Sequence, residues 1–222
     1  MDRKFWLERW EQKRIGFHEP GVNAHLQAFW PRLVLPASTK VFVPLCGKSS
    51  DLLWLRAQGH EVLGVEWSPV AVRDFFSENG LEPRRRRAGA FEEWSSDGVT
   101  LWCGDFFDLV PADLDGVGAV YDRASLIALP TSTREAYANQ MVRVLPPVVP
   151  MLLITLEYDQ SQMQGPPFAV HEPEVRALYE PHRGVRLLYE LDVLDDSPRF
   201  RARGLTQLHE KVYGLEPRTD GG

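Results

Sequence analysis

The strongest constraint on the fold is an alternation of short apolar runs with amphipathic stretches, which starts at Lys40. Five of these runs are rich in β-branched and aromatic residues and predict strands over 40–45, 61–65, 99–103, 117–121 and 151–156. Helix-start signals lie between most of them, at Ser49–Asp51, at Ser68–Pro69 and, as a capping box, at Ser132–Glu135. Strands that alternate with helices at this spacing indicate a parallel, doubly wound α/β sheet.

The C-terminal part of the chain has a different pattern. Two long, partly alternating runs, 185–194 and 203–213, are separated by Asp195-Asp-Ser-Pro198, which is turn chemistry. No helix is predicted between these runs, so we expect them to pair antiparallel. A second hairpin is predicted from 91–94 and 99–102, and the four arginines at 84–87 are expected in a solvated loop or at a strand edge. A mostly parallel α/β sheet that ends in an antiparallel hairpin resembles the outline of a class I, Rossmann-like methyltransferase.

Composition and charge argue against several classes of protein. The chain has 222 residues, and 25 Lys and Arg against 31 Asp and Glu give a formal net charge of -6, which is not the footprint of a nucleic-acid binder. No apolar stretch approaches the roughly 18 residues that span a bilayer. The charged and aromatic start, MDRKFWLERWEQKR, lacks the apolar core of a signal peptide. The two cysteines and six histidines show neither a disulfide framework nor metal-ligand spacing. We therefore expect a cytoplasmic protein with no metal site, no nucleic-acid partner and no membrane contact.

The first two predicted strands end in residues that suit a nucleoside, because open α/β sheets bind ligands beyond the carboxyl ends of their strands. Gly47 lies in the first strand-to-helix turn, where the absence of Cβ lets a ligand approach the backbone. Gly47-Lys48-Ser49 is not the end of a P-loop, since Phe42 stands where that motif needs glycine. Glu66 ends the second strand nineteen residues after Gly47, and a carboxylate there can accept hydrogen bonds from both hydroxyls of a ribose.

The spacing from Gly47 to Glu66 suits a nicotinamide dinucleotide as well as S-adenosylmethionine. A dinucleotide needs G-x-G-x-x-G to bring the backbone against its pyrophosphate, and P-L-C-G-K-S does not supply that motif. S-adenosylmethionine has no phosphate, so a single glycine is enough. The first turn therefore favours S-adenosylmethionine, with a tight turn and an exposed strand-end acid as the alternatives without a ligand.

The next two strand ends each allow two interpretations. Asp105 could accept a hydrogen bond from an adenine amino group with Phe106 flanking the ring, or Gly104-Asp105 could form an ordinary turn. Asp122 and Arg123 could pair with each other, or the guanidinium could face an anion.

Two segments outside the strand ends are also ambiguous. Phe5, Trp6 and Trp10 lie on or near one helical face, where they could pack in the core or close as an aromatic lid over a cofactor. Gly165-Pro-Pro-Phe168 follows the fifth predicted strand, where it could roof a substrate or act as a rigid connector.

Several motifs together are similar to those of one known family. In chain order they are Phe5-Trp-Leu-Glu-Arg-Trp10, Val41-Phe-Val-Pro-Leu-Cys-Gly-Lys-Ser49, Gly59-His60, Gly64-Val-Glu66, Asp122-Arg123, Gly165-Pro-Pro-Phe168 and Glu210-Lys-Val-Tyr213. They extend over nearly the whole chain, and P-L-C-G-K is far more specific than a generic glycine motif. On these residues the chain closely resembles the bacterial-type thiopurine S-methyltransferases.

The resemblance implies the residues of a site. The principal contacts to S-adenosylmethionine would be Trp10, Leu45, Glu66 and Arg123. Other cofactor contacts would come from Gly47, from Trp6 in a lid formed by residues 1–25, and from Asp105 and Phe106 beside the adenine. On the substrate side, Phe17 would face the aromatic ring, while Arg123 and Arg199 would favour an anionic thiolate.

The implied activity is methyl transfer from S-adenosylmethionine to the sulfur of aromatic or heterocyclic thiols such as thiopurines, with S-adenosylhomocysteine as product. Thiolate is the competent nucleophile, so no strong base is required and no acid or base is assigned, although Asp122 and Arg123 are candidates. The resemblance extends the acceptors to selenium and tellurium compounds and suggests a role in detoxification. We expect a monomer with one domain over 1–216 and a disordered tail at 217–222. The rival interpretations are a Rossmann dehydrogenase and an S-adenosylmethionine sensor without turnover.

Overall fold

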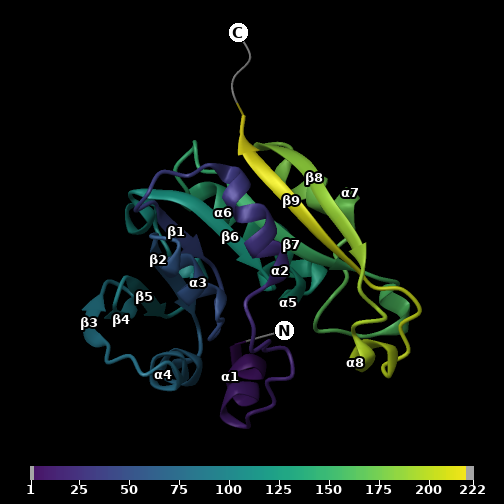
Figure 1. Cartoon of the computed structure of the whole chain (residues 1–222), viewed down its shortest axis with the longest axis horizontal. Helices are drawn as coiled ribbons and strands as arrows, with labels where there is room; N and C mark the ends of the chain where they lie inside the picture. Colours follow the sequence, from purple (N-terminus) through teal and green to yellow (C-terminus); the bar gives the residue numbers. More distant parts are fainter. Residues whose placement is uncertain (1–2, 219–222) are drawn as a thin grey trace. The chain divides into compact units, whose positions relative to one another are not determined.

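The computed structural model of the chain describes residues 3–218 (Figure 1). Contacts within the chain group it into two compact units, Met1–Tyr121 and Asp122–Gly222. Within the described range, no helix combines the length and the apolar character that crossing a membrane requires.

The first unit contains the predicted parallel strands. Its elements are α1 (Arg3–Glu11), α2 (Ala24–Phe29), β1 (Lys40–Val43), α3 (Asp51–Ala57), β2 (Glu61–Glu66), α4 (Pro69–Glu78), β3 (Arg84–Ala88), β4 (Phe91–Ser96), β5 (Val99–Cys103), the short helix η2 (Phe106–Asp108) and β6 (Val117–Arg123), whose last two residues belong to the second unit. The strands lie in the order β3-β4-β5-β2-β1-β6. β1 pairs in parallel with β2 and β6, and β2 pairs in parallel with β5. β4 pairs antiparallel with β3 and β5, which confirms the predicted hairpin, and the four arginines form the outermost strand β3.

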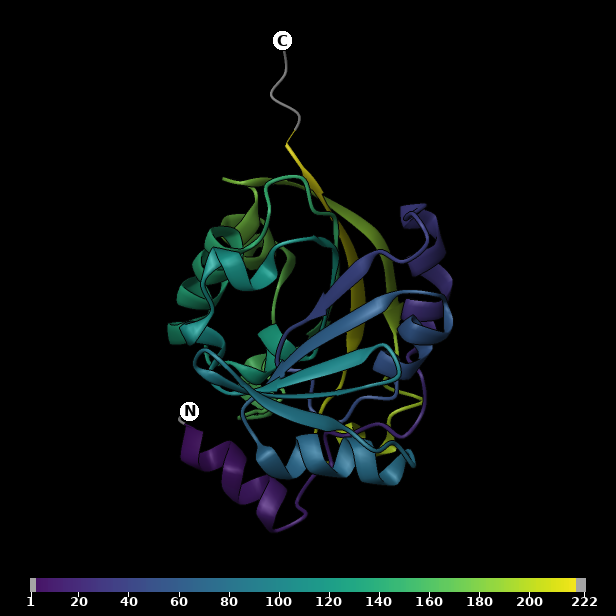
Figure 2. The ribbon, with the colours of Figure 1, turned by 90° about the vertical axis from the view of Figure 1, so that its left-hand side faces the viewer.

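Apolar side chains of the strands and of α4 make the core of this unit. Val41, Phe42 and Val65 are fully buried in β1 and β2. α4 packs on β2 and β5, and its buried residues are Ala71, Val72, Phe75 and Phe76. The Ser68 hydroxyl accepts a hydrogen bond from the Ala71 amide at 3.2 Å, which confirms the predicted N-cap. α1 lies alongside α4 (Figure 2).

The second unit contains the antiparallel part of the fold. Its elements are α5 (Ser125–Ala128), α6 (Thr131–Val144), β7 (Met151–Glu157), η4 (Gln160–Gln162), α7 (Glu172–Tyr179), β8 (Arg183–Asp192), α8 (Pro198–Arg201) and β9 (His209–Pro217). β9 lies between β7 and β8 and pairs antiparallel with both. β7 is buried along almost its whole length, because apolar residues occupy consecutive positions from Met151 to Ile154. The predicted antiparallel pairing of the two C-terminal runs is confirmed.

The structure corrects the ends of two elements. β1 ends at Val43 rather than at Leu45, because Leu45 has a φ of +44° and such a residue cannot continue a strand. The predicted capping box at Ser132–Glu135 is wrong: α6 begins at Thr131 after Pro130, and no side chain caps its first turn. Thr133 instead donates its hydroxyl to the Pro130 carbonyl at 2.9 Å.

The segment between β8 and β9 also differs from its prediction. It contains the short helix α8, which begins at Pro198 although no helix was expected there. Proline at a first helical position is a start signal that the interpretation as a turn overlooked. The strand predicted over 203–213 accordingly begins only at His209.

The predicted disordered tail at 217–222 is wrong at its first two residues. Pro217 pairs with Arg183 in the β8–β9 ladder, and the Arg218 guanidinium donates to the Pro181 carbonyl at 3.3 Å. These two residues therefore belong to the folded chain. Residues 219–222, the rest of the expected tail, lie outside the described residues.

Candidate active site

The turn between β1 and α3 has the backbone of a ligand-binding turn. The Cys46 amide donates to the Val65 carbonyl at 3.1 Å, which ties the turn to β2. Leu45 and Gly47 have φ values of +44° and +56°. A Cβ added at Gly47 would lie 3.3 Å from Cζ2 of Trp10, so both the conformation and the space favour glycine. A non-glycine residue in the left-handed region, as at Leu45, is costly and is concentrated at functional sites.

Glu66, the last residue of β2, reaches directly to this turn. Its Oε2 accepts a hydrogen bond from the Gly47 amide at 2.9 Å, and its Oε1 accepts one from the Ser68 amide at 2.7 Å. Burial raises the pKa of the Glu66 carboxyl, and the hydrogen bonds from Ser68 and Gly47 oppose that rise. An ionised carboxylate offers about four acceptor positions, which is more than these two amides occupy. The acid and the glycine predicted from their spacing are thus neighbours in space.

Three aromatic side chains at the N-terminus form one cluster with the turn. The Phe17 ring meets the Trp6 indole edge-to-face at a centroid distance of 5.3 Å and the Trp10 indole at 5.4 Å. Trp10 is buried, while Phe17 keeps 36% of its surface exposed. Through the contact of Trp10 with Gly47, the structure brings the predicted lid residues, the predicted substrate residue Phe17 and the predicted cofactor turn together in the first unit.

The strand end after β5 differs in detail from its prediction. Asp105 caps η2, since its Oδ1 accepts a hydrogen bond from the Phe107 amide at 2.9 Å. Phe106 is buried, with 2% of its surface exposed, whereas the neighbouring Phe107 exposes 42%. Sequence reasoning overlooked Phe107 as a surface ring. A pair of adjacent phenylalanines after a strand end could have indicated it, because consecutive side chains there face different directions.

The second unit holds the two catalytic candidates at the end of β6. The Asp122 carboxyl is fully buried, and its Oδ2 accepts a hydrogen bond from the Tyr137 hydroxyl of α6 at 2.7 Å. Burial raises its pKa to about 6 against the opposing hydrogen bonds from Tyr137 and Ser125. Arg123 is half-buried at the strand end. Tyr137 was not predicted as a partner, and no sequence pattern links it to Asp122.

Arg199, the other predicted arginine of the substrate side, lies in α8. Its guanidinium stands over the ring of Phe200, with Cζ 4.8 Å from the ring centroid. The proposed action of Arg123 and Arg199 on a thiolate stays a prediction.

Cys46 lies in the turn between β1 and α3 and is buried, and burial raises the pKa of its thiol well above the usual value. A buried, neutral thiol is a poor nucleophile, so we assign no reactive role to Cys46. Within residues 3–218, no group of three or more His, Cys, Asp and Glu side chains could hold a metal ion. The prediction that the protein needs no metal stays a prediction.

The arrangement in the first unit suits a nucleoside carrying a ribose. A glycine without Cβ faces an aromatic side chain, and a buried, amide-held carboxylate lies beside it with acceptor positions for hydroxyls. The residues present therefore fit S-adenosylmethionine, while the turn lacks the glycines that a pyrophosphate would require.

Comparison with known proteins places the chain in a family. A family model described as Thiopurine S-methyltransferase matches residues 1–218. The thiopurine S-methyltransferase of Nitrosospira multiformis is 51% identical over 219 residues, which are 99% of this chain and 100% of that protein. The thiopurine S-methyltransferase of Pseudomonas fluorescens is 51% identical over 215 residues, which are 97% of this chain and 99% of that protein.

Solved structures of low identity share the fold. The 1,6-didemethyltoxoflavin-N1-methyltransferase of Burkholderia thailandensis, solved with 1,6-didemethyltoxoflavin and S-adenosylhomocysteine, has a TM-score of 0.63 at 18% identity, with 97% of this chain and 86% of that chain covered. A SAM-dependent methyltransferase from Anabaena variabilis has a TM-score of 0.61 at 13% identity, with 97% of this chain and 95% of that chain covered. The predicted class I, Rossmann-like methyltransferase fold is confirmed. With the family model matched from residue 1 to 218 and full-length relatives at 51% identity, the chain belongs to the thiopurine S-methyltransferase family.

Proposed function

We propose that this protein is an S-adenosylmethionine-dependent S-methyltransferase that acts on aromatic and heterocyclic thiols, thiopurines among them. The observation that carries the proposal is the contact of Glu66 with the Gly47 amide in a chain of this family. That contact supports ribose binding, because it sets a carboxylate beside a turn where a Cβ would lie 3.3 Å from Cζ2 of Trp10.

On the cofactor side, each residue has a role that its surroundings support. S-adenosylmethionine, when bound, supplies a methyl group on a positively charged sulfur. Glu66 would accept hydrogen bonds from the ribose hydroxyls, because two amides already hold its carboxylate in place. Leu45 and Gly47 would present backbone to the ligand, and Trp10, with Trp6, would close over it. Asp105 and Phe106 would border the adenine, and Arg123 would contribute from the end of β6.

On the acceptor side, the residues would bind and orient a thiolate. Phe17 would lie against the aromatic ring of the thiol, since its own ring is partly exposed between two indoles. Arg123 and Arg199 would favour the anionic sulfur by charge. Heteroaromatic thiols ionise readily, so alignment of the reactants and exclusion of water account for the catalysis. We assign Asp122 a structural role, because its fully buried carboxyl is bound by Tyr137.

The proposal extends to the setting of the enzyme. We propose a monomer of the cytoplasm that binds small molecules rather than nucleic acid, with a single domain that includes residues 1–25 as a lid. Selenium and tellurium compounds are further acceptors, because their attack on the methyl group would likewise need no general base. Detoxification is the role that such acceptors suggest. Light scattering after size-exclusion chromatography would test the monomer.

The first experiment measures transfer of a labelled methyl group from S-adenosylmethionine to 6-mercaptopurine, with calorimetric titration of the cofactor alongside. We expect both turnover and binding. Absence of binding would contradict the cofactor assignment. Binding without turnover on a panel of thiols and selenols would instead favour the S-adenosylmethionine sensor.

A further inference from the structure

The loop that follows β7 contains a compact apolar turn at Gly165–Phe168. Gly165 has a φ of +74°, and a Cβ there would lie 2.5 Å from Cδ1 of Phe168, so the Phe168 ring folds back over the glycine. The side chains of Pro166, Pro167 and Phe168 are only half-buried. Because the turn lies beyond the carboxyl end of β7, where sheets of this class bind ligands, its exposed apolar surface suits a flat aromatic acceptor.

Two side chains hold this turn from inside the loop. The Tyr158 hydroxyl, at the carboxyl end of β7, donates to the Pro167 carbonyl at 2.6 Å. Gln160 donates from Nε2 to the Tyr158 hydroxyl at 3.1 Å and to the Met163 carbonyl. Its Oε1 accepts a hydrogen bond from the Ala169 amide at 2.9 Å. Tyr158 and Gln160, at the start of the loop, therefore bind residues on both sides of Phe168, Pro167 and Ala169.

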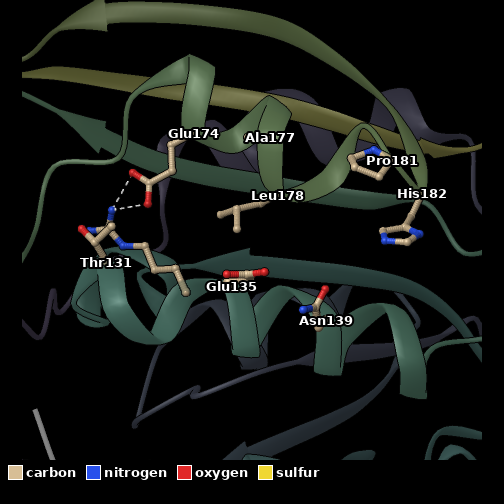
Figure 3. Close-up of a pocket in the computed structure, with 9 residues that line it drawn as sticks. Thr131, Glu135, Asn139, Glu174, Ala177, Leu178, Pro181 and His182 are labelled. Carbon is tan, nitrogen blue, oxygen red and sulfur yellow. Dashed lines mark hydrogen bonds and ion pairs between the residues drawn. The ribbon is translucent and has the colours of Figure 1, made fainter.

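A buried arginine of α6 lies near the Phe168 ring. Arg134 exposes 1% of its surface, donates from Nε to the Leu129 carbonyl at 2.9 Å and forms a bidentate ion pair with Glu174 of α7. Arg134 and Glu174 both line a pocket of about 460 Å³ formed by residues of α6, of α7 and of the segment after α7. Figure 3 shows Glu174 at one end of this pocket. The Phe168 ring centroid lies 5.9 Å from the Arg134 Cζ, and the Phe168 amide donates to the Ile127 carbonyl at 2.7 Å.

We propose that Tyr158 and Gln160 are positioning residues that set the Gly165–Phe168 turn as a wall of the acceptor site. Neither residue touches the reacting atoms; each acts by holding the carbonyl and amide groups on either side of Phe168. A loop of this length without such ties would sample many conformations, and ordering it would then lower the affinity for the acceptor. This inference rests on the proposed function and deepens it. It predicts that loss of these hydrogen bonds weakens acceptor binding but not cofactor binding.

The test compares Tyr158→Phe with Tyr179→Phe. Both substitutions remove one buried hydroxyl from the second unit, but the Tyr179 hydroxyl has no hydrogen-bond partner among the described residues. Tyr158→Phe removes two neutral hydrogen bonds, the one to the Pro167 carbonyl and the one from Gln160. We expect it to raise the KM for 6-mercaptopurine by at least about 3- to 10-fold, the effect of losing one such bond. The Kd for S-adenosylmethionine should change less than 2-fold, and Tyr179→Phe should leave both constants unchanged.

Gln160 supplies a second, independent variant. Gln160→Leu should raise the acceptor KM in the same direction, and Gln160→Glu, which keeps the acceptor for the Ala169 amide, should raise it less. The double variant Tyr158→Phe with Gln160→Leu should fall short of the product of the single effects, because the two side chains share a hydrogen bond.

Two results would overturn the inference. One is an acceptor KM in Tyr158→Phe equal to that in Tyr179→Phe. The other is a rise in acceptor KM matched by an equal loss of cofactor affinity, which would mean that the contacts only stabilise the unit. Calorimetric titration of 6-mercaptopurine into the complex with S-adenosylhomocysteine gives the same comparison without turnover. If the wild-type protein binds S-adenosylmethionine but methylates no thiol, that result would contradict the proposed function instead of this inference.

Discussion

The buried carboxyl of Asp122 gives the molecule a pH-dependent stability that one substitution should remove. Burial raises the pKa of this carboxyl from 3.8 to about 6. Since one unit of pKa corresponds to 1.36 kcal/mol, the ionised carboxylate costs about 3 kcal/mol of stability relative to the protonated form. A raised folded-state pKa means that the native protein binds more protons than the unfolded chain between the two values. This contribution to stability is therefore complete below pH 3.8 and is lost as the pH rises through about 6.

The perturbation is Asp122→Asn, which keeps an oxygen to accept the hydrogen bond from Tyr137 but carries no charge. The assay is urea unfolding of both proteins from pH 4.5 to 8. We expect the difference in the free energy of unfolding to shift in favour of the variant with rising pH, by about 2 kcal/mol over this range. Asp159→Asn is the control, because hydrogen bonds from Ser161 lower the pKa of that exposed carboxyl, so no shift should occur above pH 4.5.

A difference between wild type and Asp122→Asn that does not change with pH would refute this reasoning. Kinetics on the same variant then separate the two roles considered for Asp122. A structural carboxyl predicts a kcat at pH 8 within a few-fold of wild type. Loss of a general base would lower kcat by about 100-fold or more.

The remaining predictions concern cofactor and acceptor binding. Glu66→Ala should weaken S-adenosylmethionine binding about 100-fold, because hydrogen bonds to a charged acceptor are worth about 1.5–3 kcal/mol each. Calorimetry that shows unchanged affinity in a folded variant would contradict the ribose assignment. Gly47→Ala should lower the Tm and the cofactor affinity more than Gly89→Ala does, since both glycines have a φ of +56° but only Gly47 has Trp10 at 3.3 Å from a Cβ. Arg199→Ala should raise the KM for anionic thiols about 3- to 10-fold with cofactor affinity nearly intact; equal losses on both sides would indicate a structural residue.

Local sequence signals predicted the elements that position the cofactor turn. The Ser68 cap, the apolar face of α4 and the strand end at Glu66 each depend on residues within one or two helical turns of each other. The nineteen-residue step from Gly47 to Glu66 was informative because a strand, a turn and a helix of standard length separate neighbouring parallel strand ends. The capping box at Ser132–Glu135 failed because α6 begins one residue earlier, at Thr131 after Pro130, so Ser132 is not at the capping position.

Contacts between distant parts of the chain could not be predicted in this way. Asp122 accepts its hydrogen bond from Tyr137, and Phe107 rather than Phe106 is exposed, although nothing in either motif distinguishes these outcomes. The side-chain hydrogen bonds to the Gly165–Phe168 turn and its neighbour Ala169 come from Tyr158 and Gln160, neither of which belongs to a recognisable motif.

The amino-acid sequence by itself determined the α/β class, the order of the strands along the chain, the resemblance to one family and the pairing of Gly47 with Glu66. These follow from periodicity, capping and spacing, which are properties of neighbouring residues. The tertiary structure alone decided which side chains meet: that Trp10 closes on Gly47, that Glu66 is held by two amides, and that Asp122 is buried against Tyr137. The physical reason is that burial and hydrogen bonding across the fold depend on the packing of whole elements, and packing sets the pKa and the exposure of each group only once the chain has folded.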